Sequence, residues 1–98
     1  MTEYEDYTLR LVSAINNINK LEELLKDENK PDLNINYGYR GDTVLIKAVQ
    51  TGNIDVINLL LKYGADVNKS NKSGETPLIE ATIEGYYDIA KLLFVQYW

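Results

Sequence analysis

The chain has 98 residues, of which 45% are apolar and 26% are charged, and its formal net charge is −5. This composition indicates a single folded domain and excludes wholesale disorder. The negative charge argues against nucleic acid and anionic membrane surfaces as partners, because both are bound mainly through clustered lysine and arginine.

Several kinds of chemistry are also excluded. The sequence contains no cysteine and no histidine, which removes disulfides, thiolates, the commonest general base and the commonest zinc ligand. Because it also lacks a glycine-rich phosphate loop, we expect no enzyme activity, no cofactor and no metal. The N-terminus does not resemble a signal peptide, and no apolar run is long enough to span a bilayer. The expected location is therefore cytoplasmic.

The first part of the chain predicts a pair of helices. Its leucine, isoleucine and valine residues, beginning with Leu9, recur mostly at steps of three and four, as on the buried face of a helix. Asn16 and Asn17 interrupt this pattern, since asparagine suits a helix cap better than a helix interior. We expect one helix over about residues 4–15 and another over about residues 19–25, packed as an antiparallel hairpin. The polar stretch 26–37 contains a proline and predicts a loop.

The stretch 41–68 predicts two short helices joined by a glycine turn. Thr43 is a typical N-cap, because its hydroxyl can accept a hydrogen bond from the first free amides of a helix. Gly52 is expected to end this helix, because glycine readily adopts the left-handed conformation of a C-terminal turn. Asp55 then opens a second helix near its positive dipole end, and Gly64 follows as its stop.

The same residue types recur 33 residues further along the chain. Residues 43–48 read TVLIKA, and residues 76–81 read TPLIEA. Thr76 is the equivalent cap, and Pro77 takes the first helical position, where a missing N–H costs nothing. Such a period indicates a solenoid, in which helices too short to persist alone bury their faces on neighbouring units.

This pattern resembles the ankyrin-repeat family, whose unit is a β-turn finger followed by two antiparallel helices. Residues 74–81, GETPLIEA, match the family's G-x-T-P-L-H-x-A motif with Ile79 in place of histidine. Residues 59–68, LLLKYGADVN, include the family's later G-A-D-V-N motif. The middle unit departs from the motif at Val44, where proline is usual, and at Ile46, where histidine is usual.

The resemblance implies an all-α ankyrin solenoid of three stacked units with β-turn fingers, forming a single domain over residues 1–98. Residues 1–37 are interpreted as a divergent N-terminal capping repeat, because their offset from the second unit slips from 34 to 35 residues at the turn between the helices. Residues 38–70 are interpreted as the second repeat. Residues 71–98 are interpreted as the third repeat, with an incomplete C-terminal end.

The resemblance further implies that the chain binds a partner protein through a concave face, lined by the finger tips and the first helix of each unit. The alternative for each position is an ordinary solvated side chain. Lys47 and Glu80 lie one period apart on this exposed face and could pair across units. The positions predicted to contact a partner are Tyr39, Arg40, Asp42, Gln50, Thr51, Lys72, Glu75, Ile83 and Glu84. Tyr39 and Ile83 stand out, because tyrosine is enriched in binding hot spots and isoleucine is unfavourable at a polar surface.

The C-terminal end predicts an alternative function. Phe94, Val95, Tyr97 and Trp98 have no obvious cover in the family's register. Tyr97 and Trp98 could fold back as a cap, or the chain could belong to a longer array. The third interpretation is self-association, in which the protein is a self-assembling component and forms a homo-oligomer by stacking through this end.

Overall fold

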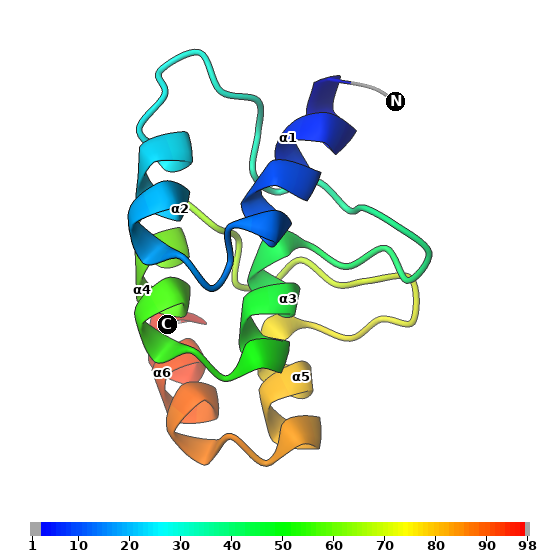
Figure 1. Ribbon diagram of the computed structural model, residues 1–98. Helices are drawn as coiled ribbons and strands as arrows, with labels where there is room; N and C mark the ends of the chain where they lie inside the picture. Colours follow the sequence, from blue (N-terminus) through cyan, green and yellow to red (C-terminus); the bar gives the residue numbers. More distant parts are fainter. Residues whose placement is uncertain (1–2, 98) are drawn as a thin grey trace.

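The computed structural model describes the backbone of residues 3–97 and the side chains of residues 6–95. The described residues form three antiparallel helical hairpins stacked side by side, α1–α2, α3–α4 and α5–α6 (Figure 1). This is the all-α repeat architecture that the sequence predicted. The helices are α1 (Glu3–Ser13), α2 (Ile18–Leu25), α3 (Val44–Thr51), α4 (Ile54–Lys62), α5 (Pro77–Glu84) and α6 (Tyr87–Tyr97).

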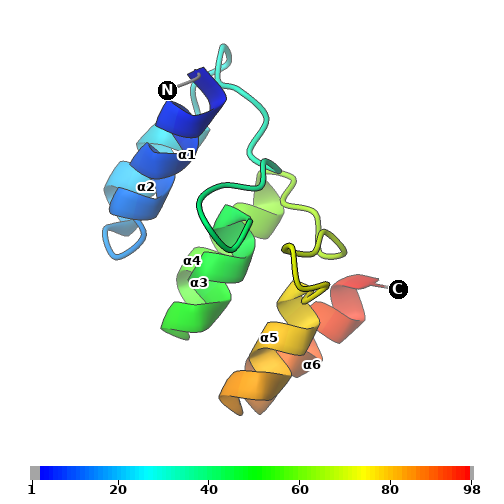
Figure 2. The same ribbon diagram turned by 90° about the vertical axis from the view of Figure 1, so that its right-hand side faces the viewer.

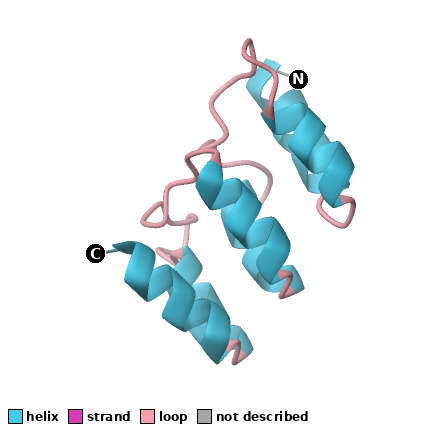
Figure 3. Cartoon of the chain, turned by 90° about the vertical axis from the view of Figure 1, so that its left-hand side faces the viewer, coloured by secondary structure: helices cyan, strands magenta, loops and turns pink. Residues whose placement is uncertain are grey.

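The helices lie in two layers. Helices α1, α3 and α5 form one layer, and α2, α4 and α6 form the other (Figure 2). In the first layer α3 packs against both α1 and α5, and in the second α4 packs against α2. The loops that precede α3 and α5 extend beyond the first layer, and the turn within each of the three hairpins lies at the opposite end of its helices (Figure 3).

We call α1, α3 and α5 the inner helices and α2, α4 and α6 the outer helices. The predicted caps set the ends of two inner helices, α3 and α5. The Thr43 hydroxyl oxygen accepts a hydrogen bond from the Ile46 N–H at 3.2 Å. The Thr76 oxygen accepts the equivalent bond at the start of α5, also at 3.2 Å. Gly52 and Gly85 end α3 and α5 in the left-handed conformation, with φ angles of 72° and 77°. The predictions for Thr43, Thr76 and Gly52 are confirmed, and Gly85 plays the equivalent part at the end of α5.

Two of the outer helices begin earlier than predicted, because asparagine caps them. Asn53 accepts hydrogen bonds from the two amides that follow Ile54, so α4 begins at Ile54 and not at Asp55. Asn17 likewise accepts a bond from the Lys20 N–H at 3.1 Å, and α2 begins at Ile18. Both asparagines adopt the extended backbone typical of an N-cap.

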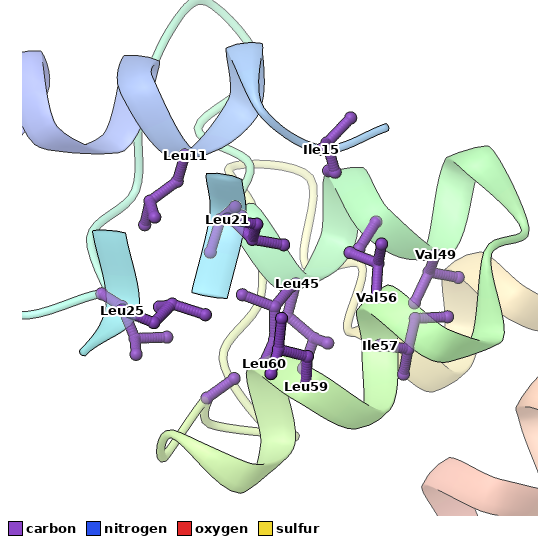
Figure 4. Packing of buried hydrophobic residues seen from close by; sticks show 14 of the residues in the cluster. Leu11, Ile15, Leu21, Leu25, Leu45, Val49, Val56, Ile57, Leu59 and Leu60 are labelled. Carbon is purple, nitrogen blue, oxygen red and sulfur yellow. The ribbon is translucent and has the colours of Figure 1, made fainter. Parts of the chain in front are cut away.

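The hydrophobic core runs through all three hairpins between the two layers. Leu11, Leu21, Leu45 and Leu60 come from four different helices and belong to one apolar cluster (Figure 4). The middle hairpin contributes the largest share of the fully covered side chains, because it has a neighbour on each side. The largest fully buried side chains are Leu11, Leu21, Leu25, Leu45, Ile46, Ile57, Leu60, Leu93, Val44, Val49, Val56 and Thr8.

Tyr7 makes the stability of the first hairpin sensitive to alkaline pH. Its ring is buried, and its hydroxyl donates a hydrogen bond to the Leu24 carbonyl at 3.4 Å. Burial, and then the negative charge of Asp27, raise the pKa of Tyr7 from 10.0 to about 12. Because the folded pKa is above the unfolded value, Tyr7 contributes stability that is complete below pH 10.0 and is lost as the pH rises through about 12.

We therefore expect wild type to lose stability relative to Tyr7→Phe between pH 10.0 and about 12. The measurement is urea unfolding at a series of pH values. Tyr39→Phe, at an exposed position, controls for removal of any tyrosine hydroxyl. If wild type and Tyr7→Phe show the same pH dependence over this range, Tyr7 is not the group responsible.

Candidate binding surface

The loop before α3 forms a short finger held by its own backbone. The Tyr37 N–H donates to the Asp42 carbonyl at 2.9 Å, and the two residues form an isolated antiparallel bridge. Gly38 and Gly41 turn the chain between Tyr37 and Asp42 with φ angles of 70° and 69°, which residues with a Cβ atom rarely adopt. The tip therefore presents Tyr39, whose side chain is 97% exposed.

A second finger, residues 71–75, lies beside the first. The Asn71 N–H donates to the Glu75 carbonyl at 3.0 Å, and the Asn71 side-chain oxygen accepts from the Ser73 and Glu75 amides, each at 3.0 Å. The Lys72 N–H donates to the Arg40 carbonyl at 3.1 Å, which joins the two fingers through their backbones. The finger tips are thus fixed relative to each other before any partner binds.

Four charged side chains and one amide lie between the fingers and α5, and we call them the Arg40 cluster: Arg40, Asp42, Asn71, Glu75 and Glu80. Guanidinium nitrogens of Arg40 lie 3.6 Å from Asp42 Oδ2, 3.5 Å from Glu75 Oε1 and 3.8 Å from Glu80 Oε2. Asn71 Nδ2 donates to Asp42 Oδ1 at 3.1 Å and to Glu75 Oε1 at 3.0 Å. The cluster therefore links both fingers to the last inner helix.

The cluster also affects a neighbouring tyrosine. Burial raises the pKa of Tyr37, and the negative charge of Asp42 raises it further. The positive charge of Arg40 acts in the opposite direction and lowers this pKa. Burial is the larger influence on this phenol, and the Asp42 carboxylate belongs to the same finger.

Two residues expected at an exposed surface are buried. Asp42 is 6% exposed and Glu80 is 3% exposed, because both carboxylates face Arg40 beneath the fingers. The expected exposure of these two side chains is therefore wrong. The suggested pair between Lys47 and Glu80 is also wrong, since the ion-pair partner of Glu80 among the described residues is Arg40.

The other predicted contact residues differ in exposure. Arg40 is about half exposed, and Glu75 and Gln50 are partly covered. The amide nitrogen of Gln50 is buried without a hydrogen-bond partner among the described residues. The exposed members lie on the finger tips and at the ends of α3 and α5: Tyr39, Thr51, Lys72, Ile83 and Glu84.

One groove on this surface includes a residue that the sequence analysis placed in the core. Leu9 of α1 is partly exposed and lines the groove together with Asn36, Tyr37 and the first finger. The Lys72 side chain closes the other side and packs over Gly41, whose missing Cβ leaves room for it. Leu9 lies two positions from the buried Tyr7 and Leu11, which is about 200° around the helix, so its spacing already separates it from the core side of α1.

The C-terminal face of the last hairpin is apolar and exposed. Ile83, Phe94 and Val95 are each at least half exposed, and Ile79 is 43% exposed. Ile46, which precedes Ile79 by one period in the middle hairpin, is 0% exposed. The side chain of Tyr97 and all of Trp98 lie outside the described residues, as does their suggested role as a cap.

Over the described residues, no group of acidic side chains is arranged to hold a metal ion. None of the described helices combines the length and the hydropathy that crossing a membrane requires.

Comparison with known proteins identifies the repeat. A family model described as ankyrin repeats (3 copies) matches residues 9–97. The Notch-regulated ankyrin repeat-containing protein of Homo sapiens is 33% identical over 81 residues, which cover 82% of this chain and 71% of that protein. Its Danio rerio counterpart A is also 33% identical over 81 residues, covering 82% and 72%. Protein phosphatase 1 regulatory subunit 27 of Homo sapiens is 45% identical over 53 residues, covering 54% of this chain and 34% of that protein.

Proposed function

The chain belongs to the ankyrin-repeat family, and we propose that it binds a partner protein through the two fingers and the layer of α1, α3 and α5. We call this the finger surface, and we take it as the concave face that the sequence analysis anticipated. A relative named as a phosphatase regulatory subunit is in keeping with a protein partner. We further propose a non-catalytic, cytoplasmic role, which agrees with the lack of histidine and cysteine.

The observation that carries this proposal is the exposure of Tyr39 on a rigid support. Its ring is 97% exposed, although an aromatic ring gains free energy by leaving water. The glycine turn of Gly38 and Gly41, with the backbone bond from Lys72, fixes the tip that carries this ring. A partner would therefore gain contact area at Tyr39 without the cost of ordering a loop.

Ile83 extends the proposed surface onto α5. Its side chain is 60% exposed and is preceded on the same helix by the exposed Thr82. A partner that spans both fingers and reaches this helix would cover an apolar side chain at one end and an aromatic one at the other. Such apolar anchors surrounded by polar groups are typical of energetically important interface positions.

We expect Tyr39→Ala and Ile83→Ala each to weaken binding of the native partner by at least about tenfold, because each removes an anchor at the interface. The partner is first isolated by affinity purification from the native source, and its affinity is then measured by titration calorimetry. Asn58→Ala is the control, because Asn58 is exposed on α4 in the other layer. Unchanged affinity for both variants would remove the finger surface from consideration.

A second candidate function is self-assembly through the C-terminal face, and the exposure of Ile79 and Ile83 favours it. Val95 is also 60% exposed, which enlarges the apolar end. If the chain assembles through this face, static light scattering gives a mass above that of the monomer, and Ile79→Asp restores the monomer. A monomeric mass at the highest soluble concentration would eliminate this candidate, while leaving the finger surface untouched.

A further inference from the structure

The Arg40 cluster contains less positive charge than its three carboxylates require for neutrality. Three carboxylates, from Asp42, Glu75 and Glu80, face one guanidinium, which leaves two formal negative charges. Among the described residues, Arg40 is the only lysine or arginine whose nitrogens lie within 4.0 Å of these carboxylates. Two of the three carboxylates are buried, so water screens this excess charge poorly.

Arg40 also leaves some hydrogen-bond acceptors of the three carboxylates without a donor. Its nitrogens lie 3.5 to 3.8 Å from the three carboxylates, whereas strong charge-assisted hydrogen bonds are about 2.7–2.9 Å long. Asn71 supplies hydrogen bonds to Asp42 and Glu75. Glu80 Oε2 is buried and receives none within the described residues. A buried anionic oxygen without a donor is costly, and a ligand that donates to it gains correspondingly.

The cluster opens onto the finger surface. The Arg40 side chain is 53% exposed and that of Glu75 is 29% exposed, so both can be reached from solvent. Tyr39, the residue before Arg40, offers an exposed aromatic ring on the same finger. An incoming cation would thus meet a ring able to make a cation–π contact and carboxylates behind it.

We propose that the Arg40 cluster is a receptor for an arginine side chain of the partner protein. This inference rests on the proposed function and specifies the partner's chemistry. The arriving guanidinium donates to Glu75 and Glu80, and Arg40 moves aside into solvent. Arginine suits the site better than lysine, because its planar fork donates to two acceptors at once. The net charge of −5 would also speed the approach of a basic partner.

A purely structural role for Arg40 predicts a different outcome on its removal. If Arg40 only neutralises the acids and joins the fingers, Arg40→Ala creates no affinity for arginine and simply loosens the loops. If the site is a receptor, Arg40 competes with the ligand for the same carboxylates. Arg40→Ala is then expected to bind an external guanidinium more tightly than wild type does.

The test uses the whole chain, labelled with ¹⁵N, and the peptide acetyl-Gly-Arg-Gly-amide as the probe. We expect saturable shifts of the backbone amides of Arg40, Asn71 and Glu75 in NMR titrations. The peptide with citrulline, which has the shape of arginine without its charge, is expected to cause no such shifts. Glu80→Gln should weaken arginine binding by about tenfold, and Arg40→Ala should strengthen it several-fold.

Asp88→Asn is the matched control, because it also removes one carboxylate but lies exposed on α6. It is expected to leave peptide binding unchanged, and the dispersion of the amide spectrum checks the fold of every variant. Equal shifts with citrulline, or equal binding by Glu80→Gln and wild type, would overturn the inference. If the peptide fails to bind while Tyr39→Ala still weakens the native partner, the inference is wrong and the proposed function stands. If the arginine peptide binds at Glu75 and Glu80 but Tyr39→Ala and Ile83→Ala both leave the affinity for the native partner unchanged, the proposed function fails.

Discussion

Replacing Leu60 by alanine is expected to lower the free energy of unfolding by about 2–5 kcal/mol, because it leaves a cavity in a packed interior. Leu60 lies on α4 of the middle hairpin, is fully buried and belongs to the apolar cluster of all three hairpins. Small domains have total stabilities of only about 5–15 kcal/mol, so this single change removes a large fraction. The measurement is urea unfolding followed by far-UV circular dichroism.

Two further variants make this result interpretable. Leu93→Ala lies one period later and is also buried, so its cost is expected within the same range of about 2–5 kcal/mol. Asn58→Ala lies on the exposed side of α4 and should change stability by no more than about 0.5 kcal/mol. An unchanged urea midpoint for either leucine variant would contradict the register that places both residues in the core.

The ends of the inner helices could be predicted from the sequence because caps are local. Thr43 and Thr76 bond to amides three residues away, and Gly52 and Gly85 adopt a conformation that glycine accepts without strain. The 33-residue period then implied the stacking, since neither hairpin could bury its apolar face alone. The division into repeats at residues 38 and 71 remains a proposal based on that period.

The candidate site was harder to predict, because its arrangement depends on contacts between units. Asp42 and Glu80 are acidic, and the family pattern placed them on the outside. Their burial follows from Arg40 and Asn71, which reach them from other parts of the chain. No local pattern encodes such a meeting of side chains, because it depends on how closely two fingers pack against α5. The exposure of Tyr39 could be predicted, since a finger tip has no neighbour to cover it.

Leu9 shows the opposite failure. Its apolar residue type grouped it with the core leucines, yet it lies two positions from the buried Leu11 and its side chain lines the groove between α1 and the first finger. Hydrophobic periodicity identifies the side of a helix that faces the rest of the protein, without saying whether a neighbour fills the space. At the N-terminal hairpin the first inner helix has a neighbour on one side only, so part of that face stays open.

Replacing Ile46 by alanine is expected to cost about 2–5 kcal/mol, whereas replacing Ile79 should cost less than about 1 kcal/mol. The two residues are of the same type, one period apart, and each N–H donates to the preceding threonine cap at 3.2 Å. Ile46 is 0% exposed and Ile79 is 43% exposed. Because the local structure is the same, the difference comes from packing between repeats. Helix α3 is covered by α5 on the side toward the next repeat, whereas no described helix covers the corresponding side of α5.

This pair of variants also distinguishes a monomer from an assembly. In a monomer, the cost of Ile79→Ala is small and independent of protein concentration. If a second copy covers the C-terminal face, alanine at this position removes a buried contact, and its cost approaches that of Ile46→Ala as the concentration rises, because association stabilises the folded state by mass action. Unfolding curves measured over a hundredfold range of concentration, together with light scattering, therefore show whether the C-terminal face is a free surface or the site of self-assembly.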